Sequence, residues 1–278
     1  MRKLNENEID ALKKQGCTAE NWLDITVVDD FGTEHIHQTN FYGEVTLGTF
    51  CKTIEINEGF YKHSGIRRAT LRNCIIGNDC LIEDVGCINT TPDACFGEGR
   101  IIPVLNEVGN GNVMIFDGLH SQLASLMIKY EQDKDFTDTV HQLVKKSIAD
   151  HSLPITTIGN DVRITATHDI TNCHINDGSI IDGALRLRDC TLKSIPEACV
   201  TIGIGVICQN SVIYNGSTIT NSAKLKNCFV GEACEITDGF TAENSLFFAN
   251  CYMSNGEACA AFCGPFSASH HKSSLLIG

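Results

Sequence analysis

Aliphatic residues recur along this chain at intervals of five or six positions. From residue 158 the steps are 6, 6, 5, 6, 6 and 5, so the pattern closes every 17 residues. These positions are Ile158, Ile164, Ile170, Ile175, Ile181, Leu187 and Leu192. The pattern resumes at Cys208 after a surplus of four residues around Ser194–Glu197, where we expect a loop to leave a corner. Neither a helical period nor the two-residue period of a single strand fits these steps.

An earlier copy of the repeat precedes this one. Ile54, Leu71 and Ile88 are spaced 17 apart, and the segment Ile76–Asp79 (IGND) recurs as Ile158–Asp161. We interpret each step as a short strand followed by a corner, with three steps forming one coil and successive coils pairing in parallel about 4.8 Å apart. Gly, Asn and Asp stand next to the aliphatic positions because corners need left-handed or turn-forming backbone. The pattern therefore predicts an all-β solenoid.

Fifteen cysteines are an unusual number for a chain that begins without an apolar leader. The odd count cannot close a disulfide framework, and no pair has the Cys-x-x-Cys spacing of common zinc sites. The position four residues after each aliphatic position should be small, since it also faces the axis. It holds Cys80, Ser179, Ser217, Ala223, Cys234, Cys251 and Cys263, and a second small-residue stack contains Cys173, Cys190, Ser211, Cys228 and Ser245. We interpret most of the cysteines as packing residues.

Two other segments depart from the repeat. Residues 6–15 have the pattern of a short helix ended by Gly16, and residues 17–50 are expected to cover the first edge of the coils. Residues 116–151 have helical spacing in two sets joined by Asp133–Asp135, which predicts an inserted helical hairpin that packs against the coils or a sister subunit. We expect one domain in four parts: an N-terminal helix and cap (1–40), first coils (41–102), a helical insertion (103–154) and remaining coils (155–278).

Composition narrows the class of protein. An apolar content of 42% argues against a disordered chain, and no apolar run is long enough to span a membrane. A net charge of −13 argues against a nucleic-acid-binding surface. With no apolar leader after Met1, we expect a cytoplasmic protein.

The aliphatic-x-x-x-small pattern resembles the hexapeptide repeat of bacterial transferases over about residues 40–100 and 155–266. This resemblance implies a single-stranded left-handed parallel β-helix. The resemblance extends to an uncharacterised sugar-nucleotide-transferase-like family, related to the acetyltransferase half of N-acetylglucosamine-1-phosphate uridyltransferases. It is carried by Gly16–Trp22, Pro103–Val108 and Gly264–Ser273. Members of that family look longer, so the chain is expected to be a fragment. The nucleotidyltransferase reaction is not expected, because no Gly-rich phosphate loop opens the chain.

The resemblance also implies a reaction. Hexapeptide acyltransferases use a histidine as general base and an acyl-CoA or carrier thioester as donor, in a groove between subunits of a trimer. Histidine suits this step because its pKa lies near neutrality. The densest polar cluster is His270-His271 followed by Lys272, so we expect His270 or His271 to be the base and Lys272 to contact substrate.

Three further residues are candidates for binding. Asn106 and Glu107 lie where the coils meet the insertion, where they are expected to hold a sugar hydroxyl or to orient the base; a loop hydrogen-bonding role is the alternative. Arg163 is expected to meet a phosphate, and Arg186, Arg188, Lys224 and Lys226 also place positive charge on coil faces. No metal is expected, since no third histidine accompanies His168 and His174 at a matching position.

The sequence leaves two functions open. One is transfer of an acyl group from acyl-CoA to a sugar or sugar nucleotide by a homo-oligomer. The other is a non-catalytic module that binds sugar nucleotides or serves as a scaffold, because fold alone does not decide activity.

Overall fold

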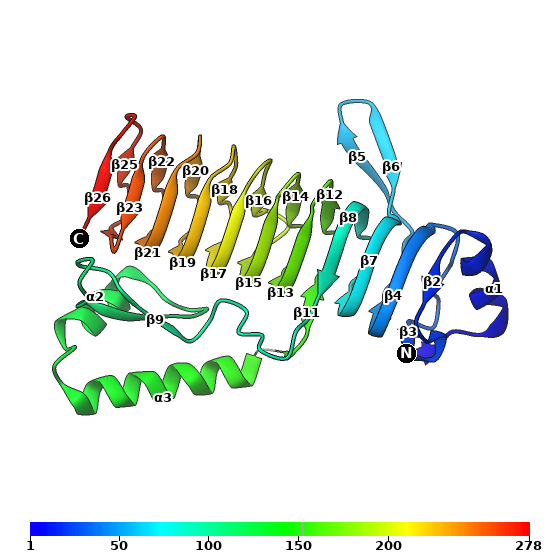
Figure 1. Cartoon of the computed structure of the whole chain (residues 1–278), viewed down its shortest axis with the longest axis horizontal. Coiled ribbons are helices and arrows are strands. Elements are labelled where there is room, and N and C mark those ends of the chain that lie inside the picture. The colour runs from blue at the N-terminus through cyan, green and yellow to red at the C-terminus, as the bar shows by residue number, and fades with distance from the viewer. Residues whose placement is uncertain (152) are drawn as a thin grey trace.

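The computed structural model describes residues 1–151 and 153–278. The chain is mostly β, with 45% of it in strands and three α-helices among the described residues. Twenty-two strands form one large sheet, and two separate pairs of strands, β5–β6 and β9–β10, lie outside it. No helix of the described residues is long and apolar enough to cross a membrane. Figure 1 shows the strands stacked side by side from the N-terminal to the C-terminal end.

The helices are α1 (Glu6–Lys14), the 3-10 turn η1 (Trp22–Asp24), α2 (Ser121–Lys129) and α3 (Lys134–His151). The strands of the first part are β1 (Arg2–Lys3), β2 (Thr18–Ala19), β3 (Ile25–Val27), β4 (Ile36–Leu47), β5 (Thr53–Asn57), β6 (Phe60–His63), β7 (Gly65–Ile76), β8 (Leu81–Asn89), β9 (Arg100–Pro103) and β10 (Asn112–Ile115). Those of the second part are β11 (Thr156–Ile158), β12 (Arg163–Thr165), β13 (Asp169–Ile175), β14 (Ile180–Asp182), β15 (Arg186–Lys193), β16 (Thr201–Ile202), β17 (Ile207–Tyr214), β18 (Thr218–Ile219), β19 (Lys224–Val230), β20 (Glu235–Thr237), β21 (Thr241–Phe247), β22 (Tyr252–Ser254), β23 (Glu257–Cys259), β24 (Phe262–Cys263), β25 (Ala268–Ser269) and β26 (Leu275–Ile277).

The 17-residue pairing predicted from the aliphatic pattern is confirmed. Ile158 lies beside Ile175 in parallel register, and Ile170 lies beside Leu187. The surplus of four residues is confirmed as well, because Leu187 pairs with Cys208. The aliphatic positions from 158 to 192 are all buried, so the row forms the interior of the sheet.

The predicted single-stranded left-handed β-helix is wrong. The sheet has 22 strands and includes a closed barrel of four parallel strands. The physical reason lies at one bend in each repeat, where Asn172 has a φ of 56°. One residue in the left-handed region turns the chain without ending the strand, so Ile170 and Ile175 belong to the same strand, β13. From β13 to β21, each repeat therefore contributes one long and one short strand instead of three short ones.

The bend residues form a row of their own, which we call the amide row: Asn172, Asp189, Asn210, Asn227 and Asn244, all with positive φ. Asparagine and aspartate tolerate this backbone better than other residues with side chains. Their side chains bond to the next repeat: the amide of Asn210 donates to Asn227 at 3.1 Å, and that of Asn227 to Asn244 at 2.9 Å. The same residues thus turn the chain and hold the repeats in register.

The interpretation of the cysteines as packing residues is confirmed for ten of the fifteen. The buried ones are Cys17, Cys74, Cys80, Cys173, Cys190, Cys208, Cys228, Cys234, Cys251 and Cys263. Burial raises the pKa of the Cys80 thiol to about 12. At neutral pH this thiol stays protonated and behaves as a small apolar side chain.

The first end of the sheet is covered by the N-terminal segment. The helix predicted from residue 6 is present as α1, and its Leu12 is fully buried in the main core. A capping box begins the helix, because Asn5 and Glu8 each accept a hydrogen bond from the other's backbone amide. Strand β1 pairs antiparallel with β3 beside this helix, which shields part of the edge.

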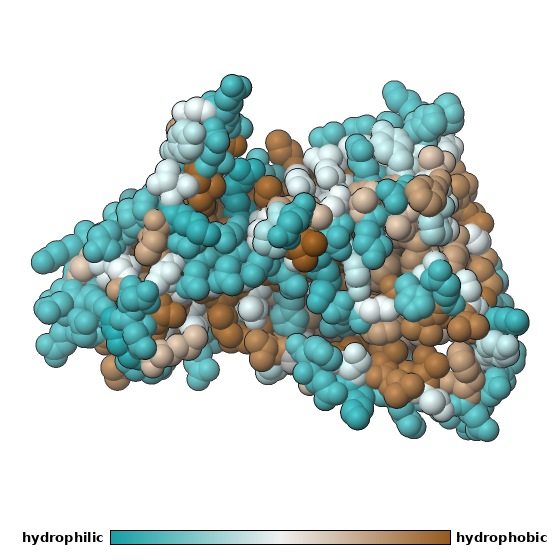
Figure 2. All heavy atoms as spheres, turned by 180° about the vertical axis from the view of Figure 1, so that it is seen from behind, coloured by the Kyte–Doolittle hydropathy of each residue, from teal (hydrophilic) through white to brown (hydrophobic). Residues whose placement is uncertain are grey.

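A hairpin arm, β5–β6, was not predicted. Ile54, which was assigned to the early repeat, lies in this arm and pairs with Lys62. That assignment is wrong, because Leu71 pairs with Phe41 on one side and Ile88 on the other. The arm stands out from the body of the molecule in both views (Figure 1 and Figure 2).

The two helices predicted between residues 116 and 151 are present as α2 and α3. Together with β9 and β10 they form an insert that packs on the outside of the strand stack. The contact is a second apolar core, in which Met114, Leu119 and Met127 of the insert meet Phe229 and Leu246 of the stack. In this part of the outer surface the register aligns Val212, Phe229, Leu246 and Phe262 in one row. The insert therefore covers an apolar stripe that the repeat alone would leave exposed.

Candidate functional site

A cavity of about 430 Å³ lies between the end of α3 and the strand stack. Its size falls within the range of small-molecule sites. We call it the strap cavity, because the segment 90–99, here called the strap, contributes Glu98 to its lining and joins β8 to β9. The lining residues from the strap and insert are Glu98, Asp117, Ser147, Ile148, His151 and Leu153, and those from the stack are Thr157, Gly159, His174, Ile175, Asn176, Asp177, Thr191 and Lys193.

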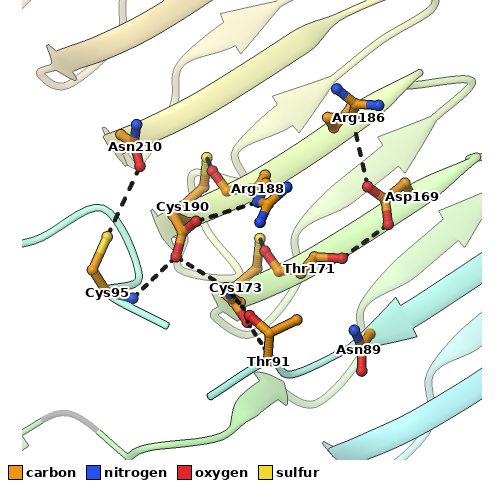
Figure 3. Close-up of polar contacts among 12 residues, drawn as sticks. Asn89, Thr91, Cys95, Asp169, Thr171, Cys173, Arg186, Arg188, Cys190 and Asn210 are labelled. Carbon is orange, nitrogen blue, oxygen red and sulfur yellow. Dashed lines mark hydrogen bonds and ion pairs between the residues drawn. The ribbon is translucent and has the colours of Figure 1, made fainter. Parts of the chain in front are cut away.

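The strap is held by the amide row (Figure 3). The buried carboxylate of Asp189 accepts hydrogen bonds from the Cys95 backbone amide at 3.0 Å and from the Asn172 side chain at 3.1 Å. The Asn172 amide also donates to the Thr91 hydroxyl at 2.9 Å. Gly97, with a φ of +83°, passes so close to the stack that a Cβ would lie 2.6 Å from the Ser211 carbonyl oxygen. The strap is therefore fixed in place by polar bonds and by a glycine that no other residue can replace without strain.

The strap places Phe96 over His174. The two rings stack with centroids 3.9 Å apart, and the His174 Nε2 atom lies 2.9 Å from the Leu153 carbonyl oxygen. A nitrogen must carry its hydrogen to donate to a carbonyl, so Nδ1 holds the lone pair in the neutral ring. Burial lowers the pKa of His174, against the opposing effect of hydrogen bonds to Leu153 and Ile155. Burial thus disfavours the protonated imidazolium and favours the neutral ring.

Asp117 connects the insert to the stack at the other side of the cavity. Its carboxylate receives the Lys193 ammonium at 2.6 Å and the Tyr214 hydroxyl at 2.8 Å. The Asp117 backbone amide donates to Glu98 Oε1 at 2.6 Å. Burial raises the pKa of Glu98, against the opposing effect of the hydrogen bond from the Asp117 backbone amide. These groups place the partly buried Glu98 carboxyl group in the lining of the cavity.

The cavity has more carboxylates than cationic side chains. Two of its hydroxyls are engaged by the protein: Thr191 donates to the Phe96 carbonyl oxygen at 2.8 Å and Thr157 to that of Ile155 at 3.1 Å. The one ammonium, Lys193, is paired with a carboxylate. Three carboxylates line the space, those of Glu98, Asp117 and Asp177. A ligand that brings hydroxyl or amine donors fits this lining, whereas a phosphate would meet net negative charge.

The residues predicted for the site lie elsewhere. His270 and His271 are exposed, with ring centroids 4.4 Å apart, and His270 is 6.4 Å from the Tyr252 ring. Lys272 beside them is exposed as well. None of the three lines the strap cavity.

The other predicted binding residues are also outside the cavity. Asn106 caps its own loop by accepting from the Val108 backbone amide at 2.9 Å, which is the alternative role considered for it. Glu107 is exposed and lies near the Cys259 thiol. Burial raises the pKa of this thiol, and the charge of Glu107 raises it further. Arg163 lies on β12 between Leu81 and Ile180, on another side of the stack. The structure therefore does not bring these residues to one site.

The sequence analysis missed Glu98 and Lys193, and it considered His174 only as a metal ligand. One signal was present: in the register of the stack, Thr157, His174 and Thr191 are polar outward positions in a row that becomes apolar from Val212 onward. The change from polar to apolar residues along this row marks the place where the insert stops packing closely on the strand stack.

This architecture, stacked parallel repeats with an inserted helical pair and a cavity between them, defines a class of β-rich repeat proteins. The chain belongs to the family described as a domain of unknown function, DUF4954, which it matches over residues 1–278. It is similar to an uncharacterized protein of Treponema pallidum (strain Nichols), with 25% identity over 304 residues. The match covers 99% of this chain and 42% of that relative, so the chain spans less than half of the relative's length.

Proposed function

We propose that this chain binds a small hydroxyl- or amine-bearing molecule, such as an amino sugar, in the strap cavity. The observation that carries the proposal is the excess of carboxylates, those of Glu98, Asp117 and Asp177, over the one ammonium in a cavity of ligand size. The cavity favours a smaller ligand than the sugar nucleotide considered from the sequence. A sugar unit suits the lining, whereas a diphosphate would need a separate surface.

Glu98 is the residue that we expect to distinguish ligands. An ammonium group beside it favours the ionised carboxylate, so amine binding should release a proton from the fraction of Glu98 that is protonated. Binding of an amine should therefore strengthen as pH rises through the range in which Glu98 titrates. A neutral sugar should lack this dependence.

Calorimetry with glucosamine and glucose tests the proposal. We expect both to bind, with glucosamine bound more tightly, and Glu98→Gln to weaken glucosamine roughly tenfold, the loss of one charge-assisted hydrogen bond. Glu107→Gln is the matched control, since it removes an exposed carboxylate outside the cavity. Absence of binding by both sugars, or an equal loss in the two variants, would refute a ligand site in the strap cavity.

A second candidate is acyl transfer to such a ligand, as the resemblance to hexapeptide acyltransferases predicts. The observation that favours it is the neutral His174 imidazole in the cavity. In this reaction the Nδ1 atom would take the proton from the acceptor's amine or hydroxyl as the acyl carbon of a thioester is attacked, and the CoA thiolate would leave.

Turnover separates the two candidates. Acetyl-CoA is incubated with glucosamine, and free CoA is measured by chromatography, because a thiol reagent would also react with the exposed Cys51. If His174 is the base, His174→Gln abolishes turnover and the double variant His270→Ala/His271→Ala keeps it. The reverse pattern would support the base expected from the sequence, and no CoA release from the wild type would reject acyl transfer.

We also propose that the protein is a cytoplasmic homotrimer. Fifteen unpaired cysteines suit a reducing compartment. Light scattering coupled to gel filtration gives the mass of the assembly, and the mass of a monomer or dimer would contradict the trimer.

A further inference from the structure

Four cations lie together on one face of the stack, a feature that the strap cavity does not use. Arg186 and Arg188 project outward from β15. Two strands away, Lys224 and Lys226 occupy the matching positions on β19, with Ile207 and Gln209 of β17 between them. Parallel neighbours are about 4.8 Å apart, so the two pairs are separated by roughly 10 Å, which long side chains can close over the middle strand. We call this surface the basic face.

The cations of the basic face retain most of their hydrogen-bonding capacity. The closest contact of Arg186 with Asp169 is through Nε at 3.6 Å, and that of Arg188 with Asp189 is also through Nε at 3.6 Å (Figure 3). Both contacts are longer than a hydrogen bond, so the guanidinium nitrogens of the two arginines are left to bind phosphate oxygens in pairs. Lys224 has no ion pair among the described residues.

The margins of the basic face limit what it can bind. Lys226 is paired with Glu243 at 2.6 Å, and this carboxylate limits the positive area toward the C-terminal end of the stack. At the amide row, Arg100 of β9 reaches over the edge and donates to the Asn210 side chain at 3.3 Å, which adds a fifth cation beside Arg188. The positive area thus spans three strands in a chain of net charge −13. An area this small fits a compact anion better than a long polymer, which would cross negative surface on both sides.

We propose that the basic face binds the diphosphate group of a small molecule. Arg186 and Arg188 hold the phosphate oxygens from one strand, and Lys224 and Lys226 hold them from the other. The face supplies the donors that the strap cavity lacks, so the two surfaces select different chemical groups.

Calorimetry with inorganic pyrophosphate at low ionic strength tests the proposal, with uridine diphosphate as a second probe. We expect both to bind, and the double variant Arg186→Gln/Arg188→Gln to weaken them at least tenfold. Lys224→Gln alone should weaken them severalfold. The matched control is Arg163→Gln, which removes the same charge from another side of the stack and should change affinity less than twofold. All these side chains are at least partly exposed, and circular dichroism confirms that each variant folds.

Three results would overturn the proposal. The first is that pyrophosphate does not bind, and the second is that Arg163→Gln loses as much affinity as the double variant, which would mean general charge attraction. The third is that heparin or RNA of equal phosphate or sulfate concentration displaces pyrophosphate completely, which would assign the face to a polymer. None of these results bears on sugar binding in the strap cavity, which is measured with glucose and glucosamine, neither of which carries a phosphate.

Discussion

Replacing Gly97 with alanine should detach the strap. Gly97 has a φ of +83°, and a Cβ there would lie 2.6 Å from the Ser211 carbonyl oxygen and 2.8 Å from that of Asp189. Both obstacles are backbone atoms of the stack, which cannot rotate away as a side chain can. The substitution therefore forces the strap outward, together with Phe96 and Glu98.

A comparison with a second glycine separates the loss in folding stability into a backbone part and a steric part. Gly239 has a φ of +73°, and nothing lies within 4 Å of the position that a Cβ would take there, so Gly239→Ala adds only backbone strain of about 1–2 kcal/mol. Gly97→Ala adds the same strain and a steric term of about 1–3 kcal/mol, which is typical of overpacked sites. We expect Gly97→Ala to be the more destabilising by that difference.

Urea unfolding and native-state hydrogen exchange together measure the effect. If the strap opens without unfolding the sheet, the loss in global stability is limited, but the Cys95 amide, bonded to Asp189, exchanges faster. Glucosamine binding should fall as well, because Glu98 leaves the cavity. Equal stability of the two alanine variants, combined with unchanged exchange at Cys95, would refute the close packing of the strap.

Three further predictions concern the contact between insert and stack. Phe229→Ala, at a buried ring 5.3 Å from Tyr214, should reduce the free energy of unfolding by about 3–5 kcal/mol, whereas the exposed Leu143→Ala should change it by less than about 0.5 kcal/mol; urea titration compares them. Asp117→Asn should reduce the free energy of unfolding by about 1 kcal/mol. In a double-mutant cycle, Lys193→Gln should reduce it less in the Asp117→Asn background than in the wild type, and additive losses would argue against coupling of the two side chains. The lowered pKa of His174 means that the unfolded chain binds more protons, so wild-type stability should fall as pH drops below the ordinary value of 6.5. His174→Gln should show a smaller fall, and parallel stability curves would contradict a half-buried imidazole that folds in its neutral form.

The interior of this protein was predictable because a regular spacing has one physical solution. Ile158, Ile175 and Leu192 must be buried together, and the 17-residue step that joins them appears directly in the sequence. The joining of two sides into one strand was not predictable from spacing, since it depends on whether Asn172 turns within a strand or ends it. Ile54 shows the limit of the method: a correct interval placed an arm residue in the core.

The site was harder to predict from the sequence than the core. His270 and His271 were chosen because polar residues are dense there, but density along the chain says nothing about which segments meet in space. Glu98 and His174 are 76 residues apart in sequence and become neighbours only because the strap crosses the amide row. Their pKa shifts arise from burial, which no local pattern records.

The amide row has a consequence for how this protein can change length. Three bend residues bond to their equivalents in the next repeat, as Asn172 joins Asp189, Asn210 joins Asn227 and Asn227 joins Asn244. Most stabilising contacts in such a stack join adjacent repeats. Removal of one whole repeat between Asn227 and Asn244 would leave the flanking partners with the same chemistry and the same register. Loss of a single residue there would instead turn every following side chain to the wrong face. Gene duplication or deletion in units of 17 codons is therefore the change in length that such a stack tolerates.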